Sequence, residues 1–302
     1  MPTLSLQIPR ADIVSQLYPL LANQTCNLVE LTWEQHLFHE QRSWSAVSLL
    51  QSVNLDALSP IDKANIWNAG RAELTTKPGA DRLAHLADAE CRRWQDTNPA
   101  LASVLQACST WSRYWNEEES FHETTLNHLA HQLGFEPVSD ESFLEFRKIF
   151  PNDDMLRTLV LLAISEITAM VNYSTCAQLA QDPGLRKLFK QIASDEAQHL
   201  SYFISFAKAL VDSGEYSPKG AFAITHFFLR EDGELQGSQR QKKEQRNTHV
   251  NWWDALEYDW DQVPNNLARK QGIIFSVLRQ ITGIAVHSVN EVEQTWMDLV
   301  GC

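Results

Sequence analysis

The sequence contains little of what turns and β-strands need. Only 11 Gly and 11 Pro are spread over 302 residues, and alternating runs of β-branched residues are few. Such a chain is expected to be all-α, because long amphipathic helices need neither frequent turns nor alternation. Hydrophobic residues make up 44% of the chain, which is ample for a buried core.

Cysteine is also scarce. The five cysteines are odd in number and scattered, and no two form a Cys-x-x-Cys pair: they are Cys26, Cys91, Cys108, Cys176 and Cys302. This pattern argues against a disulfide framework or a structural zinc site and favours the reducing cytoplasm. Residues 1–10 lack the basic start and apolar core of a signal peptide, so a cytoplasmic location is expected.

Membrane segments and basic surfaces are absent as well. No uncharged apolar run reaches the length of a membrane span. The net charge of −13 disfavours binding to the phosphate backbone of nucleic acid. Neither a membrane span nor a nucleic-acid partner is therefore expected.

Helical patterns cover most of the chain. The expected helices are residues 11–52, 60–95, 99–133, 139–149, 152–180, 184–212, 220–230 and 266–299, the last as one helix or a pair. Lys77-Pro78-Gly79 should kink or interrupt the second of these helices just after Glu73, and Asn152 or Asp153 should cap the fifth. No linker divides the chain, so we expect a single domain over residues 1–302. Its four-helix core would cover about 60–212 and a helical extension about 215–302.

One polar stretch has no apolar stripe. It covers residues 231–249 and includes Arg240, Lys242, Lys243 and Arg246. A solvated loop or exposed helix is the simple interpretation. The functional alternative is a mobile lid or a docking patch for an acidic partner.

Two Glu-x-x-His pairs stand out within the helical patterns. They are Glu119-Ser-Phe-His122 and Glu196-Ala-Gln-His199, and fewer than one such pair is expected by chance from this composition. Residues three apart lie on the same face of a helix, so each pair can direct a carboxylate and an imidazole at one point. Two such pairs, with one Glu from each of two further helices, form the di-iron site of ferritin-like four-helix proteins.

The positions of the turns identify the two further glutamates. Ligands on consecutive antiparallel helices lie at one level, so the connecting turn should fall midway between them. Glu166 and Glu196 have their midpoint in Gln181-Asp182-Pro183-Gly184, a strong helix-breaking sequence. Glu166 also lies in a nearly apolar run, where a charge is costly to bury unless it is paired or binds metal.

For Glu119 the partner must lie upstream. Glu73 gives a midpoint in Asp96-Thr97-Asn98-Pro99, a second turn sequence. The competing Glu90 gives a midpoint near residue 104, inside a helical pattern. Glu73 is therefore the predicted ligand.

Other acids and histidines have simpler interpretations. Glu117 and Glu118 are expected to be surface charges, because neither has a His three residues later. His128 and His131 lack a matching acid on their face and are expected at the surface or in a structural role. His36 and His39 resemble half of a metal-binding face, but no second half completes it.

The predicted ligand set contains four carboxylates, two imidazoles and no thiolate. This set suits iron, with manganese as the alternative, rather than a closed zinc site. A carboxylate-bridged pair of such metals can bind dioxygen, and an apolar interior would keep water from the oxidant. Removing hydrogen from an unactivated carbon or inserting oxygen then requires two external electrons per turnover, so a reductase or ferredoxin is implied.

Two segments resemble those of a known enzyme family. Residues 111–122, Trp-Ser-Arg-Tyr-Trp-Asn-Glu-Glu-Glu-Ser-Phe-His, and residues 192–199, Ile-Ala-Ser-Asp-Glu-Ala-Gln-His, resemble the second-helix and fourth-helix motifs of soluble acyl-ACP desaturases. These enzymes act on fatty acyl chains attached to acyl carrier protein. The resemblance covers about residues 60–210 and is specific at the two Glu-x-x-His helices.

The resemblance implies roles for individual residues. The metal ligands would be Glu73, Glu119, His122, Glu166, Glu196 and His199. Trp115 and Asp195 match positions near the route by which electrons enter the site. The family has a Thr near the oxygen site, three residues after its third-helix Glu; this chain has Ala169 there and Thr168 one place earlier.

The primary hypothesis is therefore an oxygen-dependent di-iron oxidoreductase that desaturates a fatty acyl chain on acyl carrier protein or another carrier. A hydroxylase or N-oxygenase of specialised metabolism is the enzymatic alternative. Arylamine N-oxygenases have an additional His one turn before the fourth-helix Glu, where this chain has Ile192. A ferritin-like metal-binding protein without turnover is the alternative of another class. Apolar helix faces make a homodimer an expected assembly.

Overall fold

A computed structural model describes residues 35–37, 39–73, 76–135, 154–230, 260 and 263–301. Within these ranges the chain forms helices and the turns that connect them, and no strand. The all-α class predicted from the composition is confirmed.

The long central helices are α5 (Pro60–Glu73), α6 (Thr76–Trp94), α7 (Pro99–Gln132), α9 (Met155–Leu179) and α10 (Pro183–Asp212). A short α4 (Ala46–Leu50) and a 3-10 helix η1 (Leu55–Ala57) precede them. The chain continues through α11 (Lys219–Arg230), α13 (Asn266–Thr282) and α14 (Val289–Val300). The pattern predicted for residues 266–299 is thus a pair of helices.

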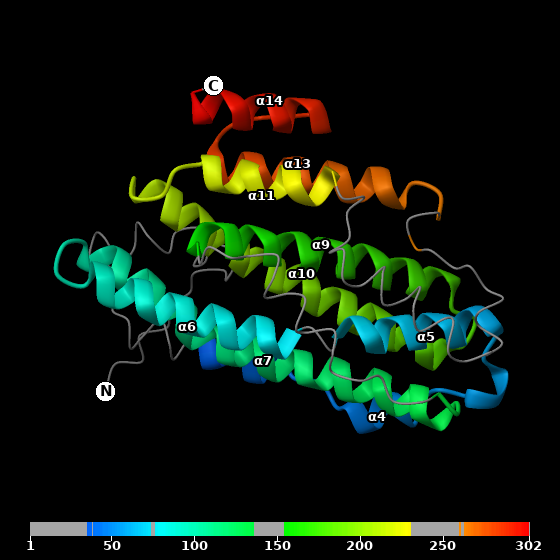
Figure 1. Cartoon of the computed structure of the whole chain (residues 1–302). Helices are drawn as coiled ribbons and strands as arrows, with labels where there is room; N and C mark the ends of the chain where they lie inside the picture. Colours follow the sequence, from blue (N-terminus) through cyan, green and yellow to red (C-terminus); the bar gives the residue numbers. More distant parts are fainter. Residues whose placement is uncertain are drawn as a thin grey trace, which may run out of the picture.

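The central helices enclose a shared interior. Both α5 and α6 pack on α7, α7 packs on α10, α10 on α9, and α9 returns to α5 and α6 (Figure 1). Four helical segments, with α5 and α6 together forming one of them, therefore make a closed ring of neighbours. This arrangement allows side chains from all four segments to meet in the middle.

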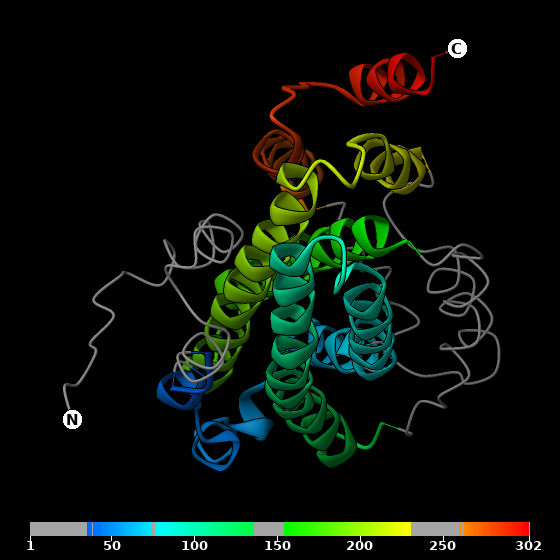
Figure 2. The ribbon, with the colours of Figure 1, turned by 90° about the vertical axis from the view of Figure 1, so that its left-hand side faces the viewer.

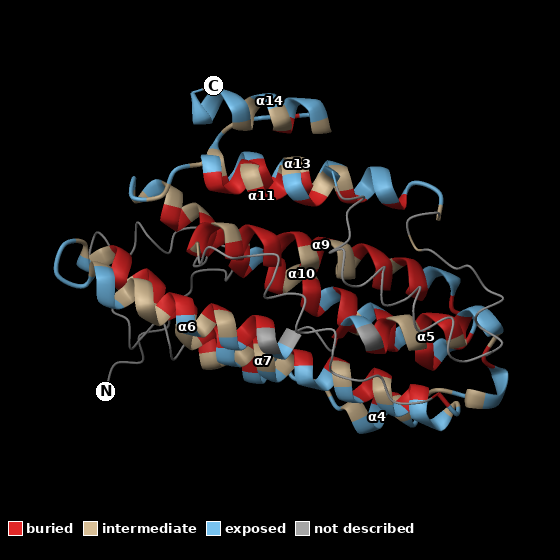
Figure 3. Ribbon diagram, in the orientation of Figure 1, coloured by how far each residue is buried: buried red, intermediate tan, exposed pale blue. Residues whose placement is uncertain are grey.

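The C-terminal helices form an outer layer over this core. α11 packs on α9 and on α14, and α13 packs on α9 and α10 (Figures 1 and 2). Figure 3 shows that α9 and α10 are largely buried, whereas α14 is mostly exposed. The extension therefore covers the α9 and α10 side of the core.

The two turns used to choose the glutamate partners lie between helices as expected. Pro99 begins α7 and Pro183 begins α10, at positions where the missing N–H has no helical partner to lose. The side chains of Asn98 and Asp182 cap these helices by accepting backbone N–H groups at 3.1 and 2.7 Å.

Gly184 is required where the second turn meets the N-terminal part of the chain. A Cβ at this position would lie 2.0 Å from the backbone oxygen of Ser52, so no side chain fits. The neighbouring Asp182 carboxylate accepts the backbone N–H of Asn54 at 3.3 Å. These contacts fix residues 52–54 against the start of α10.

One predicted helix start is wrong in detail: α9 is capped by Asp154, rather than by Asn152 or Asp153, which lie outside the described residues. The predicted kink or interruption just after Glu73 agrees with the helix bounds, because α5 ends at Glu73 and α6 begins at Thr76. Proline is tolerated just inside the start of α6, because the first N–H groups of a helix have no intrahelical acceptor.

The pattern over residues 11–52 is also not one continuous helix. Its described part is helical at 35–37 and 39–42, not helical at 43–45, and helical again in α4, where the Ser45 side chain accepts the N–H of Ser48 at 3.2 Å. Residues 11–34, the expected helix 139–149 and the polar stretch 231–249 lie outside the described residues.

α9 is the most apolar of the described helices. Met155–Leu179 is long and apolar enough to cross a membrane by length and composition, but 72% of its most apolar window is buried inside the protein. This burial is typical of the core helix of a folded domain.

The apolar core has two parts. One gathers residues such as Trp111, Trp115 and Phe203, and the other gathers Leu126, Tyr173 and Ile192. Along α7 and α10 the predicted metal ligands lie in the interval between these two clusters, and on α9 Glu166 lies at the edge of the first cluster, between Ile164 and Ile167. The interior is therefore apolar on both sides of one polar layer.

Candidate metal centre

The structure brings all six predicted ligands into one buried group. His122 is fully buried, and the exposed fraction of each of the other five is 4% or less. The group divides into two sets of potential metal-binding atoms, each set within 4.8 Å. The first set is Glu73, Glu119, His122 and Glu196; the second is Glu119, Glu166, Glu196 and His199.

Two carboxylates belong to both sets. One Glu119 oxygen lies 3.3 Å from His122 Nδ1 and the other lies 2.9 Å from His199 Nδ1. Likewise, one Glu196 oxygen lies 3.5 Å from His122 Nδ1 and the other lies 3.2 Å from His199 Nδ1. Each shared carboxylate thus directs one oxygen to each histidine, which is the arrangement that bridges a pair of metal ions.

The other two glutamates each belong to one side. Glu73 lies 3.9 Å from His122 Nδ1, and Glu166 lies 3.5 Å from His199 Nδ1. The centre therefore has two equivalent halves, each with one histidine, one terminal carboxylate and both shared carboxylates. The competing Glu90 lies elsewhere, where it accepts hydrogen bonds from Tyr216 and Trp94.

Burial and mutual repulsion perturb the terminal carboxylates. Burial is the main cause that raises the pKa of Glu73 well above its usual range, with the neighbouring charges of Glu119 and Glu196 adding to it. The pKa of Glu166 is raised in the same way, first by burial and then by Glu196. In the absence of metal these two side chains favour their protonated, neutral form.

The pKa values of the two histidines and of Glu119 shift in the direction opposite to the one that burial alone would cause. Burial lowers the pKa of His122, but the adjacent charge of Glu119 and hydrogen bonds to carboxylates outweigh it and raise the pKa. The pKa of His199 is raised similarly, chiefly by its hydrogen bond with Glu118. Burial alone would raise the pKa of Glu119, yet the two histidines lower it. Without metal, protons on the imidazoles supply the positive charge of the centre.

One buried atom of this group is compatible with a metal ligand. Nδ1 of His122 has no hydrogen-bond partner, although Glu73, Glu119 and Glu196 surround it. Buried polar atoms are nearly always satisfied, so an unpartnered imidazole nitrogen facing three carboxylates suits a metal ligand. The four carboxylates also carry the charge that two divalent cations would neutralise.

A hydrogen-bonded network outside the centre fixes His122. Its Nε2 lies 3.2 Å from Asp195 Oδ2, and the same carboxylate accepts Trp44 Nε1 at 2.7 Å and Arg42 at 2.6 Å. The Trp44 ring also stacks over His122, with centroids 6.1 Å apart. Burial alone would raise the pKa of Asp195, but the hydrogen bond with His122 and the charges of His122, His199 and Arg42 together lower it. Asp195 therefore stays ionised and orients the ligand.

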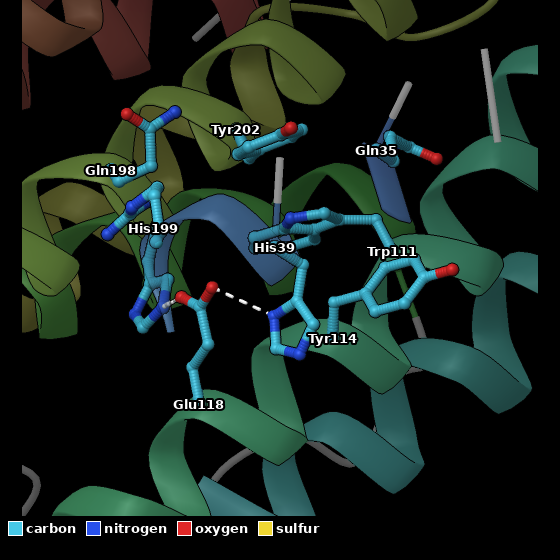
Figure 4. Close-up of a pocket in the computed structure, with 9 residues that line it drawn as sticks. Gln35, His39, Trp111, Tyr114, Glu118, Gln198, His199 and Tyr202 are labelled. Carbon is cyan, nitrogen blue, oxygen red and sulfur yellow. Dashed lines mark hydrogen bonds and ion pairs between the residues drawn. The ribbon is translucent and has the colours of Figure 1, made fainter. Parts of the chain in front are cut away.

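His199 has an equivalent partner in Glu118. His199 Nε2 lies 2.8 Å from one Glu118 oxygen, and His39 Nδ1 lies 2.9 Å from the other (Figure 4). These two hydrogen bonds outweigh burial and lower the pKa of Glu118. The prediction that Glu118 is a surface charge is therefore wrong, whereas Glu117 is exposed as expected.

The three residues given roles by the family resemblance lie in different places. Trp115 is buried against the centre, and its Nε1 donates to Glu119 at 3.0 Å. Asp195 contacts His122 as described above. Thr168 is not brought to the centre, because its hydroxyl donates to the Ile164 carbonyl at 3.0 Å. Two residues along a helix turn the side chain by about 200°, so Thr168 points away from the face of Glu166.

Three residues beside the centre were not predicted to lie there: Tyr173, His39 and Trp44. Tyr173, two turns after Glu166 on α9, is fully buried and donates its hydroxyl to Glu73. His39 and Trp44 come from a segment distant in sequence. An aromatic residue seven positions after a ligand could have indicated Tyr173. In the sequence His39 resembles part of a metal-binding face, and it lies against Glu118, whereas nothing local indicates Trp44. His128 and His131 are exposed, as predicted.

Aromatic side chains close the space beside His199. Trp111 stacks on Tyr202 with centroids 4.7 Å apart, and Phe203 meets Trp111 and Trp115 edge-on at 5.0 Å each. A small pocket borders this cluster, lined by Tyr114, Glu118 and other side chains (Figure 4). Aromatic side chains therefore cover the centre on the His199 side.

Comparisons with protein-family models, with curated proteins and with solved structures gave no match. The function is therefore argued from the centre itself.

Proposed function

We propose that the protein is an oxygen-dependent di-iron oxidoreductase built on a ferritin-like four-helix bundle. One observation carries this proposal. Glu119 and Glu196 each direct one oxygen toward each of two buried histidines, and each half adds its own terminal carboxylate. A single-metal site would not need two shared carboxylates placed symmetrically between two imidazoles.

The donor set favours iron, with manganese as the alternative. Oxygen and imidazole donors without thiolate suit these metals, and the free cysteines Cys91, Cys108 and Cys176 take no part in either set. Glu73 and Glu119 with His122 and Glu196 would hold one ion, and Glu166 with His199 would complete the second position. When bound, a ferrous pair would supply the electrons that reduce dioxygen and so the power to oxidise an unactivated bond.

The chain's own residues would support this chemistry in three ways. Trp111, Trp115 and Phe203 exclude water from the His199 side of the centre. Glu118 and Asp195 hold the outer nitrogens of the two histidines, so the inner nitrogens face the metals. Both apolar clusters keep the polar layer away from solvent.

The narrower proposal is desaturation of a fatty acyl chain on acyl carrier protein, which rests on the resemblance of residues 111–122 and 192–199 to the desaturase motifs. In this reaction a CH2–CH2 unit loses two hydrogens, dioxygen takes up these with two further electrons and two protons, and two waters form. A ferredoxin or reductase would supply the electrons. The hydrogen-bonded path from half-buried Trp44 through Asp195 to His122 would connect the donor to the centre.

A hydroxylase or N-oxygenase acting on a small substrate is the second candidate. The observation favouring it is the aromatic packing of Trp111, Tyr202 and Phe203, which occupies the space between α7 and α10 beside His199. An acyl chain needs a long apolar channel beside the centre, whereas a small substrate needs less of the space that these aromatic side chains fill.

The first experiment is an anaerobic ferrous titration of the purified protein, followed by exposure to oxygen and optical spectroscopy. Two irons per chain, with oxygen uptake and a transient absorption, are the expected result. A single zinc, or no metal, would refute the proposal. Two irons that never react with oxygen would instead indicate a metal-binding protein without turnover.

Mass spectrometry of products then separates the two candidates. With a chemical reductant, loss of two hydrogens from acyl carrier protein-bound chains indicates desaturation. Gain of one oxygen by a small amine or aromatic compound, with no change in the acyl substrate, indicates the oxygenase.

A further inference from the structure

One helical turn outside the central bundle contacts both halves of the metal centre. Residues 39–42 form this turn, and His39 and Arg42 lie three residues apart on its inner face. His39 Nδ1 meets Glu118 of α7 at 2.9 Å, and Arg42 meets Asp195 of α10 at 2.6 Å. The turn therefore joins two central helices across the outside of the centre.

Both of its partners hold a histidine ligand. Glu118 uses its second oxygen for His199 Nε2 at 2.8 Å, and Asp195 uses its second oxygen for His122 Nε2 at 3.2 Å. Each carboxylate is thus shared between the turn on one side and an imidazole on the other. The same arrangement appears twice, once for each half of the centre.

We propose that residues 39–42 are a clasp that positions both histidine ligands through Glu118 and Asp195, so that closing of the clasp and metal binding are coupled. His39 is the positioning residue for His199, and Arg42, with Trp44, is the positioning residue for His122. This inference rests on the two-metal centre proposed above and adds the device that holds its imidazoles in place.

Burial and charge support this role. The side chain of His39 is 7% exposed and that of Arg42 is 18% exposed, although both belong to a short turn at the edge of the core. Glu118 and Asp195 are themselves nearly buried, at 13% and 3%. A buried carboxylate needs donors on both oxygens. His39 contacts the Glu118 oxygen that His199 does not use. Arg42 contacts Asp195 Oδ1 at 2.6 Å, closer than the second donor to this oxygen, Gln191 of α10, at 3.3 Å.

The two limbs of the clasp act on different histidines, His39 through Glu118 on His199 and Arg42 through Asp195 on His122, and this difference allows a test. Loss of the His39 limb should disturb the His199 position and leave the His122 position intact. Loss of the Arg42 limb should do the reverse. If the turn only added general stability, loss of either limb would weaken iron binding at both positions equally.

The experiment uses the full chain, ⁵⁷Fe²⁺ without oxygen, and Mössbauer spectra recorded during titration, so that the two iron positions are counted separately. His39→Ala is expected to weaken iron at one position by about 10- to 100-fold, and Arg42→Ala at the other. His39→Gln keeps an N–H donor toward Glu118 and should restore most of the loss. Glu40→Gln, on the exposed face of the same turn, is the matched control and should bind iron like the wild type.

Hydrogen exchange on the wild type tests the coupling without any substitution. Since coupling is reciprocal, ferrous iron should slow amide exchange over residues 39–44 at least several-fold. Exchange in the exposed α14 should stay constant.

Unequal losses, rescue by His39→Gln and slowed exchange support the clasp. Equal losses at both positions, no loss in either variant, or unchanged exchange in an iron-loaded wild type would overturn it while leaving the di-iron function standing. A wild type that binds no iron pair would overturn the proposed function and the clasp together.

Discussion

The division of the centre into shared and terminal carboxylates makes a sharp prediction about two similar substitutions. Glu166 belongs only to the His199 half, whereas Glu196 belongs to both halves. Glu166→Gln should therefore weaken one metal position, and Glu196→Gln should weaken both. Glutamine is nearly isosteric with the protonated acid that Glu166 favours without metal, so the metal-free protein should keep its fold.

The magnitude follows from ligand linkage. Free metal at 100 times its dissociation constant stabilises a folded protein by about 2.7 kcal/mol per site. If loss of one ligand weakens a site about 100-fold, roughly 2 kcal/mol of that stabilisation disappears. For a chain of this size the melting temperature should fall by roughly 3 °C for Glu166→Gln and by about twice as much for Glu196→Gln.

Anaerobic ferrous titration and thermal unfolding in excess ferrous iron provide the assay. The expected numbers of tightly bound irons are one for Glu166→Gln and none for Glu196→Gln, with unchanged melting of both metal-free proteins. Glu90→Gln is the control, because Glu90 bonds Tyr216 far from the centre and should bind iron like the wild type. If Glu196→Gln removed only one iron, the bridging role would be refuted. If Glu90→Gln abolished binding while Glu73→Gln did not, the choice of Glu73 would be wrong.

Three further predictions concern protons, a hydrogen bond and a close contact. Because the terminal carboxylates and both histidines have raised pKa values without metal, iron binding should release protons and tighten as pH rises, which calorimetry in two buffers measures. Tyr173→Phe removes the donor to Glu73 and should weaken iron on the His122 side about tenfold in a ferrous titration. Gly184→Ala should cost at least about 2 kcal/mol in urea unfolding, because its Cβ would collide with the Ser52 backbone; Gly272→Ala, with open space, should not.

The helices were predictable because their signals are local. A Pro in the first turn with an Asn or Asp cap marks the starts of α7 and α10, and these two starts suffice to place Glu73 and Glu166 level with the Glu-x-x-His pairs. Periodicity and turn position together thus locate all six buried residues. The start of α9 was missed only by one or two residues, because Asn152, Asp153 and Asp154 are equally good caps.

The residues around the ligands were not predictable in the same way. Glu118 is one position from Glu119, which places it about 100° around the helix, and the sequence does not reveal whether another segment covers that face. The segment that covers it contributes His39, 79 residues earlier in the chain. Trp44 reaches Asp195 across 151 residues. Contacts of such separation depend on the packing of whole helices and leave no local pattern.

The folded state tolerates the six buried Glu and His side chains because of where they lie. Six ionisable side chains buried together without a compensating ion would strongly disfavour the folded state, since each charge loses its hydration. The metal-free centre avoids part of this cost by placing protons on Glu73, Glu166 and the histidines. The two apolar clusters on either side hold the helices in register while it does so. Because these clusters fix the helices, metal could replace the protons with little movement of the backbone. In the described residues the clusters pack long helices joined by short turns, and this packing keeps the six side chains at one level.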